Sequence, residues 1–94
     1  MTHFVYLMAS RPGGALYTGR ARDLRTRIEA HRAGLSNHTA KYRINRLEWF
    51  EEHTDFETAL RRERSTKRWK RAWKIDLIST SNPHWQDITA HIPD

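Results

Sequence analysis

The chain has 94 residues, of which 17 are Lys or Arg and 11 are Asp or Glu, so its formal net charge is +6 with neutral histidines. This length predicts one small domain over residues 1–94, with its core over about residues 4–87. The positive charge favours nucleic acid over a membrane surface as the partner, because the longest apolar run, residues 4–9, is far too short to cross a bilayer. With no cysteine and no basic signal-peptide start, we expect a cytoplasmic protein without disulfides, thiol nucleophiles or cysteine zinc sites.

The first third of the chain predicts a β-hairpin followed by a helix. An aromatic and β-branched run over residues 3–9 is typical of a strand, and a turn rich in Pro and Gly follows it. Residues 15–19 then form the returning strand, which Gly19 is expected to end. Asp23 is placed to cap a helix over residues 24–32.

The remaining two thirds predict a loop, a strand and two helices. Residues 35–43 are small, polar and basic, which is typical of a loop, and the partial alternation of residues 44–51 predicts a third strand. A Thr-x-x-Glu capping box at residues 54–57 precedes a helix predicted over residues 55–70. A shorter helix is predicted over residues 72–79.

The side-chain pattern assigns faces to two of these elements. In the third strand, Leu47 and Trp49 are predicted to share one face because strand residues alternate with a period of two. In the long helix, Phe56 and Leu60 define the inward face, and Glu63 falls within the same apolar arc. A carboxylate in that arc of a positively charged protein is a candidate functional group.

One face of the predicted helix over residues 24–32 combines apolar and cationic side chains. Leu24, Arg27, Ile28 and His31 follow at helical spacings, so they lie on one stripe that we expect to face inward. A guanidinium there needs an anionic partner, because leaving a buried charge unpaired costs ~3–5 kcal/mol. The partner is either Glu63, in a structural salt bridge, or a phosphate group of a substrate.

These side chains suit phosphodiester hydrolysis. That reaction needs a group that positions the attacking water, a cation for the transition state and a carboxylate that holds a metal at the leaving oxygen. Tyr17 or His31 suits the first task, Arg27 the second and Glu63 the third, while Tyr6 and Tyr17 lie side by side if the hairpin register allows it. The structural alternative is that the tyrosines are ordinary strand aromatics and His31 is a satisfied core histidine.

The order of these short motifs resembles the GIY-YIG nuclease superfamily, in particular its small stand-alone bacterial members. The resemblance rests on Phe4-Val5-Tyr6, Tyr17-Thr18-Gly19, Arg27, His31, Glu63 and Asn82-Pro83. It implies an α+β fold with a three-stranded antiparallel sheet flanked by helices, and cleavage of DNA. It also implies a site of Tyr6, Tyr17, Arg27, His31, Glu63 and Asn82, with Gly19 as a structural residue and one Mg²⁺ or Mn²⁺ on Glu63.

The chain departs from the motifs of this superfamily at two places. Phe4-Val5 stands where the first motif has Gly-Ile, and Thr18 replaces the middle Ile of the second motif. Tyr6, Tyr17 and Gly19 are retained, so these departures concern strand packing more than chemistry.

A basic stretch with two tryptophans follows the candidate metal ligand. We expect nucleic-acid contacts from Lys67, Lys70 and Lys74 in this stretch and from Lys41 and Tyr42 in the predicted loop. Indoles stack on unpaired bases, but in a domain this small both Trp69 and Trp73 are expected in the core.

Together these features predict a metal-dependent DNA endonuclease that selects single-stranded, nicked or branched DNA by structure rather than by sequence, in repair or recombination. A catalytically silent nucleic-acid-binding module is the alternative, and a purely structural partner protein is the third. Little sequence preference is expected because few side chains are left to contact base edges. The oligomeric state is expected to be a monomer or a weak dimer.

Overall fold

A computed structural model describes residues 2–93 and contains one antiparallel sheet of three strands. The strands are β1 (His3–Ala9), β2 (Leu16–Ala21) and β3 (Arg46–His53), and their order across the sheet is β2-β1-β3. The hairpin and the third strand agree with the sequence prediction, although β2 continues two residues beyond Gly19 and β3 begins and ends two residues later than expected. The α+β class and the three-stranded sheet are confirmed.

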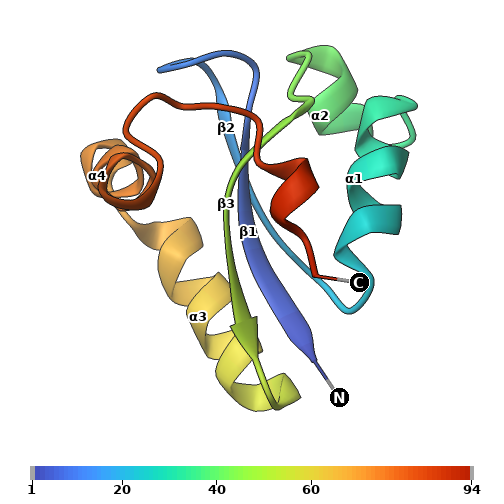
Figure 1. The fold of residues 1–94 in the computed structure, drawn as a ribbon, viewed down its shortest axis with the longest axis vertical. Helices are drawn as coiled ribbons and strands as arrows, with labels where there is room; N and C mark the ends of the chain where they lie inside the picture. Colours follow the sequence, from blue (N-terminus) through green and yellow to red (C-terminus); the bar gives the residue numbers. More distant parts are fainter. Residues whose placement is uncertain (1, 94) are drawn as a thin grey trace.

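Helices cover both faces of this sheet (Figure 1). On one side lie α3 (Phe56–Arg68) and α4 (Arg71–Ser81), and on the other lie α1 (Leu24–Arg32), α2 (Asn37–Lys41) and the short 3₁₀ turn η1 (Thr89–His91). No helix in the described part of the chain is long and apolar enough to span a membrane.

Strand β1 is the centre of the molecule, and each of its residues is buried. Because strand side chains alternate between faces, Phe4, Tyr6 and Met8 pack with α1 while Val5 and Leu7 pack toward α3 and α4. A strand covered on both faces needs a continuous apolar run, which explains why the sequence shows one here.

Strand β3 differs from the prediction because it contains a β-bulge. Leu7 pairs with Trp49 but the next residue, Met8, pairs with Leu47, which leaves Glu48 as the extra residue. Leu47 therefore joins the core on the α1 side and Trp49 joins the core on the α3 side. The prediction that these two share a face is wrong, since a bulge breaks the period of two on which it relied.

The helix caps explain where α1 and α3 begin. The carboxylate of Asp23 accepts a hydrogen bond from the backbone N–H of Thr26 at 3.1 Å, as predicted. In α3 the cap is Asp55, which accepts from the N–H of Thr58 at 2.9 Å, and not the predicted Thr54. The shift by one residue does not change where the helix runs.

Two further expectations about the helices are wrong. Phe56 does not face inward: it is 47% exposed, and the guanidinium carbon of Arg20 lies 4.7 Å from the centre of its ring. A cation over an aromatic face stabilises such a half-exposed ring. The predicted loop over residues 35–43 contains the helix α2, whose five residues are too few for helical periodicity to show in the sequence.

Candidate active site

The site is built where β1 and β2 lie side by side. Tyr6 pairs with Gly19 in the hairpin register, and a Cβ on Gly19 would lie 2.5 Å from the phenol oxygen of Tyr6 and 2.9 Å from the ring of Tyr17. No side chain tolerates such contacts, so glycine is required. The sequence interpretation of Gly19 as the end of the strand is wrong: it lies inside β2, where its missing side chain leaves room for the two tyrosines.

A buried chain of hydrogen bonds fixes Tyr6 and His31. The hydroxyl of Thr39 donates to the carbonyl of Ser36 at 3.3 Å, so its oxygen accepts from Nδ1 of His31 at 2.9 Å. Nε2 of His31 is then the unprotonated nitrogen, and it accepts the hydroxyl hydrogen of Tyr6 at 2.9 Å. This chain sets the tautomer of a neutral imidazole and directs its lone pair at the phenol.

Tyr17 completes an aromatic cluster with these two residues. Its ring centre lies 5.0 Å from that of His31 and 6.1 Å from that of Tyr6. Burial raises the pKa of Tyr6 well above its usual value, and Tyr17 adds to the effect through its charge and a hydrogen bond. Tyr6 is therefore a neutral hydroxyl at physiological pH, with its hydrogen directed at His31.

His31 is suited to accept a proton. Burial lowers its pKa below the ordinary 6.5, and the nearby charge of Arg27 lowers it further, since both disfavour the imidazolium. At neutral pH the imidazole is consequently uncharged and has a basic nitrogen available.

Arg27 is exposed on α1, one helical turn before His31. Its charge reaches both Tyr6, whose pKa it lowers, and His31. It lines a cleft of about 560 Å³ beside β2 together with Arg20 and Arg22. Because no ion pair among the described residues includes Arg27, the protein does not supply the carboxylate partner that the sequence left open.

Glu63 approaches the site from α3, on the far side of edge strand β2. Its side chain is only 12% exposed, as its place in the apolar arc predicted. Oε1 accepts a hydrogen bond from Nε of Arg20 at 3.2 Å, and Oε2 lies 2.9 Å from Nζ of Lys67. The structural alternative of an Arg27–Glu63 salt bridge is therefore wrong, because Glu63 pairs with Arg20 and Lys67 instead. The charge of Glu63 nevertheless reaches Tyr6 and contributes to the raised pKa of that phenol.

The donor set suits one type of metal. Among residues 2–93 there is no group of three His, Asp or Glu side chains that could enclose an ion. Glu63 is thus not part of a closed set of protein ligands among these residues. Hydrated Mg²⁺ or Mn²⁺ is held in this way, by one or two carboxylates plus water and substrate oxygens, whereas zinc sites need three or four protein ligands.

Asn82 is the one predicted site residue that the structure does not bring to this cluster. Its amide nitrogen contacts the backbone oxygen of Glu48 at 3.0 Å, a carboxylate oxygen of Glu48 at 3.2 Å and the carbonyl of Gln86 at 2.8 Å. Its amide oxygen accepts from the N–H of Gln86 at 3.0 Å. These contacts lie against β3, the edge strand opposite β2, and they use both amide hydrogens. The resemblance predicts a catalytic role for Asn82, whereas these contacts favour a structural role beside β3.

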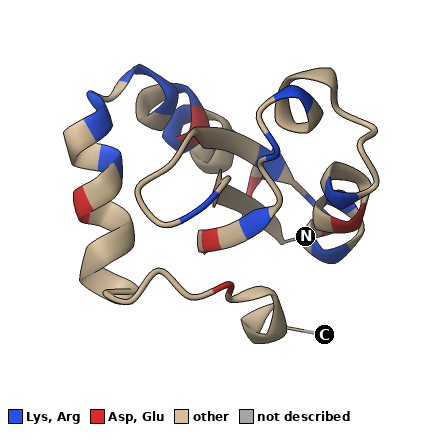
Figure 2. Ribbon diagram, turned by 90° about the horizontal axis from the view of Figure 1, so that it is seen from above, with Lys and Arg blue, Asp and Glu red and all other residues tan. Residues whose placement is uncertain are grey.

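The predicted nucleic-acid residues are exposed, with the exception of the half-buried Lys74. Lys and Arg residues gather around the end of α3, the start of α4 and the α1–α2 side, whereas no Lys or Arg follows Lys74 (Figure 2). Trp73 is 52% exposed, with Nζ of Lys70 lying 5.9 Å from its ring, and Trp69 is half-buried. Placing both indoles in the core was wrong, because α4 turns away from α3 at Lys70 and leaves their edges in water.

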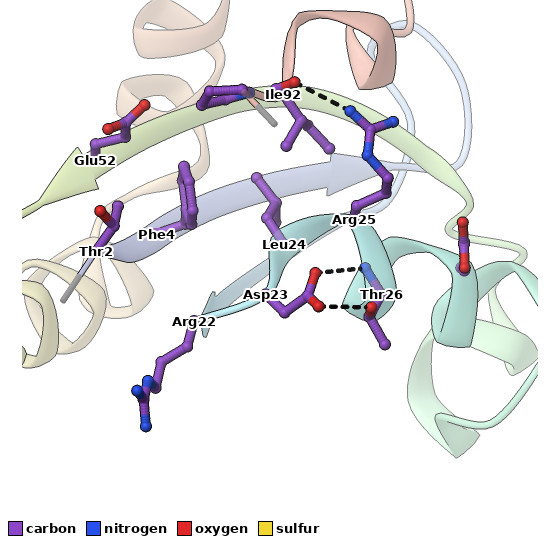
Figure 3. A pocket seen from close by; sticks show the side chains of 11 residues that line it. Thr2, Phe4, Arg22, Asp23, Leu24, Arg25, Thr26, Glu52 and Ile92 are labelled. Carbon is purple, nitrogen blue, oxygen red and sulfur yellow. Dashed lines mark hydrogen bonds between the residues drawn. The ribbon is translucent and has the colours of Figure 1, made fainter.

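A separate pocket of about 640 Å³ lies at the start of α1 and contains none of the predicted site residues (Figure 3). It is bordered by Phe4, Leu24 and Ile92, and Arg25 donates to the carbonyl of Ile92 at 3.0 Å across its rim. In the tyrosine cluster Tyr6 and His31 are buried, and His31 with Thr39 lines a smaller pocket of about 270 Å³. We therefore locate the chemistry by its side chains and not by the larger hollow.

Two residues of the site were not found from the sequence. Arg20 follows Gly19, so it points to the opposite face of β2, where α3 brings Glu63; the alternation of the strand could have indicated this. Thr39 orients His31 from α2, eight residues further along, and no local pattern predicts that contact.

The fold and the site define a GIY-YIG catalytic domain: the sequence model of that family matches residues 2–76, and the chain belongs to it. Within the family it is similar to UPF0213 proteins. Those of Staphylococcus aureus strains Mu50 and N315 are 36% identical over 78 residues, which is 82% of this chain and 94% of theirs. The solution NMR structure of the UPF0213 protein BH0048 from Bacillus halodurans has a TM-score of 0.56 at 30% identity, covering 95% of both chains. Membership of the family indicates a nuclease with DNA as its substrate.

Proposed function

We propose that this protein is a divalent-metal-dependent endonuclease that hydrolyses DNA phosphodiester bonds and selects its substrate by structure rather than by base sequence. The observation that carries the proposal is the hydrogen-bonded chain Tyr6–His31–Thr39 beside Tyr17. A purely structural cluster needs only that its buried polar groups are paired, and either tautomer of His31 would pair them. A proton-transfer site needs an imidazole held neutral with its lone pair directed at a phenol.

In this mechanism Tyr17 orients the attacking water and takes up its proton. The hydroxyl of Tyr17 passes a proton to the oxygen of Tyr6, which passes its own to Nε2 of His31, so the net change is transfer of a proton from water to the imidazole. The water oxygen then forms a bond to phosphorus as the bond to the leaving oxygen breaks.

Two charged side chains act on the phosphate itself. Arg27 is exposed, lies within electrostatic reach of the tyrosines and offers a fork of N–H donors to the phosphate oxygens, where negative charge increases in the transition state. Glu63 would hold a single Mg²⁺ or Mn²⁺, which when bound supplies charge stabilisation at the leaving oxygen. For that, Glu63 must exchange Arg20 or Lys67 as its partner.

That exchange is the reason to keep a second candidate function, a nucleic-acid-binding module that does not cut. Both carboxylate oxygens of Glu63 are held by cations, an arrangement that needs no metal. The two functions differ in whether a metal ion displaces Arg20 or Lys67 when DNA is present.

A cleavage panel decides between them. Single-stranded, nicked, duplex and branched oligonucleotides of one composition are incubated with Mg²⁺, with Mn²⁺ and with EDTA. The nuclease function predicts shortened products only with metal and different rates for different structures. Retention of every oligonucleotide at full length in all conditions, with DNA still bound, supports the silent module.

The salt dependence of binding tests the contact with DNA by itself. If Lys41, Lys67, Lys70 and Lys74 lie along a phosphate backbone, the logarithm of affinity falls linearly with the logarithm of salt concentration, at about −0.7 per contact for a single strand. Single Lys→Ala changes then weaken binding modestly and independently of sequence. A flat salt dependence excludes both functions.

A further inference from the structure

A row of aromatic rings leads away from the candidate active site along α2. The ring centre of His38 lies 6.1 Å from that of Tyr17 and 5.1 Å from that of Tyr42. Tyr42 is 48% exposed although it is a large aromatic residue, and His38 is exposed beside it. The row therefore begins at the tyrosine assigned to the attacking water and ends in solvent.

The helix that carries these rings is fixed to the catalytic histidine. His38 lies in α2 and Tyr42 caps its C-terminal end, and the two rings are in contact. Thr39, between them in the sequence, points inward and accepts the hydrogen bond from His31. The residue after Tyr42, Arg43, has a φ of 55°, a strained conformation for arginine, and its N–H donates to the carbonyl of Ala40 at 3.2 Å. This turn fixes the backbone directly after Tyr42, at the end of α2.

The charge around the row identifies what it accommodates. Nζ of Lys41 lies 5.4 Å from the centre of the Tyr42 ring, and Arg43 is exposed next to it. Exposed rings interleaved with cations suit a ligand that has flat apolar faces and negative charge along one edge. A nucleotide has both, since its base stacks on aromatic rings while its phosphate meets the cations.

We propose that His38 and Tyr42 form a stacking platform for an unpaired base of single-stranded DNA next to the phosphate that is cut. This inference rests on the proposed nuclease function, because it takes Tyr17 as the place of the reacting phosphate. It names the class of DNA structure that the site prefers. The faces of bases in a duplex are already stacked on their neighbours, so only an unpaired base gains from a ring on the protein.

The test measures binding in EDTA, so that it does not depend on cleavage. A fluorescein-labelled single-stranded oligonucleotide and a hairpin duplex of equal composition are titrated with wild-type protein and three variants. Tyr42→Leu is expected to weaken single-strand binding about 5- to 100-fold and duplex binding less than about twofold. Tyr42→Phe retains the ring and should stay within about threefold of wild type. Leu35→Ala removes exposed apolar surface from the same connection without removing a ring, and should change neither affinity.

A second measurement links the platform to the site. The single strand carries one abasic nucleotide at successive positions around the cut, and cleavage rates are compared in wild type and Tyr42→Leu. At one position beside the cut, the abasic nucleotide should slow cleavage by the wild-type protein. At that position Tyr42→Leu should lower the cleavage rate no further, because the base and the ring of Tyr42 form one contact. Additive losses at every position would overturn the platform.

The two proposals fail in different ways. Equal weakening of single-strand and duplex binding by Tyr42→Leu overturns the platform and leaves the nuclease untouched. Selective loss of single-strand binding in a wild-type background that never cuts DNA supports the platform and removes the nuclease function. No effect of Tyr42→Leu on either oligonucleotide, with cleavage retained, also overturns the platform.

Discussion

Glu63 on α3 is paired with Arg20 on β2, with Oε1 lying 3.2 Å from Nε, and not with Arg27 on α1. Arg27 is exposed and has no ion-pair partner among residues 2–93, and the candidate metal ligand Glu63 is held at the edge of the sheet. The guanidinium of Arg20 also covers the ring of Phe56. Arg20 therefore connects the start of α3, the candidate metal ligand Glu63 and the edge strand β2.

Glu63→Gln is predicted to abolish cleavage while the protein stays folded and still binds DNA. The amide keeps the shape of the side chain but cannot hold a divalent cation. Stability should fall by only about 0.5–1 kcal/mol, because the two ion pairs that are lost involve side chains in contact with water, Arg20 at 26% exposed and Lys67 at 52%. Thermal unfolding, DNA retention and cleavage with Mg²⁺ measure the three quantities.

Glu57→Gln is the matched control, since Glu57 lies on the same helix in an exposed ion pair with Arg61. This variant should cut DNA at the wild-type rate. If Glu63→Gln also cut at that rate while well folded, Glu63 would not be the metal ligand.

Arg27→Ala is predicted to lower cleavage at least ~10²-fold, the usual effect of losing one electrostatic donor to a transition state. Stability should change by less than about 0.5 kcal/mol, because Arg27 is exposed on α1. Arg27→Lys should recover only part of the rate, since an ammonium lacks the bidentate fork. Arg64→Ala, an equal loss of charge from an exposed position on α3, is the control; a similar loss of rate there would point to general binding rather than catalysis.

The sequence predicted the parts of the fold that depend on local signals. The apolar run of β1, the cap at Asp23 and the inward positions of Leu24, Ile28 and His31 each follow from neighbouring residues, and each is confirmed. The fourth member of that stripe, Arg27, was also expected to face inward, which is wrong, since it is exposed. The same signals brought Tyr6, Tyr17, Arg27, His31 and Glu63 forward as one set.

What the sequence did not predict depends on contacts between distant residues. At the bulge, the carbonyl of Glu48 accepts a hydrogen bond from the amide of Asn82, far along the chain. Glu63 pairs with Arg20 because of how α3 packs on β2, and a helical-wheel projection of α3 alone cannot show that packing. Phe56 is stable at the surface because Arg20 covers it, which no periodicity reveals.

The acid limb of the pH–rate profile is predicted to lie below pH 6.5. The proposed mechanism needs neutral His31, and burial together with the charge of Arg27 lowers the pKa of His31 below 6.5. The same shift affects stability: as pH falls below about 6.5 the unfolded chain binds a proton that the folded His31 does not, so stability decreases through this window. The pKa of His3 is also lowered, so His3 adds to the loss of stability at low pH. His31→Gln should therefore reduce the slope of the unfolding free energy against pH without removing it. A slope that His31→Gln leaves unchanged would contradict the assignment.

Thr18→Val is predicted to stabilise the protein by about 1 kcal/mol, because the buried hydroxyl of Thr18 has no hydrogen-bond partner within residues 2–93. The melting temperature should rise by about 4–8 °C for a domain of this size. Thr18 pairs with Leu7 on the face of the sheet opposite Tyr6.

Thr66→Val supplies the contrast for this substitution. Thr66 is equally buried, but its hydroxyl donates to the carbonyl of Arg62 at 2.7 Å, so removing it should destabilise the protein. If both substitutions changed the stability equally, the missing hydrogen bond at Thr18 would not explain the effect of Thr18→Val.

Asn82→Ala is predicted to act on stability and not on the chemistry. The change removes four hydrogen-bond contacts and leaves buried groups of Glu48 and Gln86 without partners, which should cost about 2–4 kcal/mol. Measured at a temperature where the variant is folded, the cleavage rate should stay near that of wild type. A stable Asn82→Ala protein that has lost cleavage would instead place this residue in the reaction, as the family motif implies.

Asn82→Asp separates the two roles further. The new carboxylate would lie against that of Glu48, whose pKa burial already raises, so the folded state favours protonation of the pair. A group with a raised pKa in the folded state contributes stability at low pH and loses it as pH rises. The difference in unfolding free energy between wild type and Asn82→Asp should therefore widen from about pH 4.5 upward, as urea titrations over this range would measure. A difference independent of pH would mean that the amide of Asn82 does not hold the bulge at Glu48.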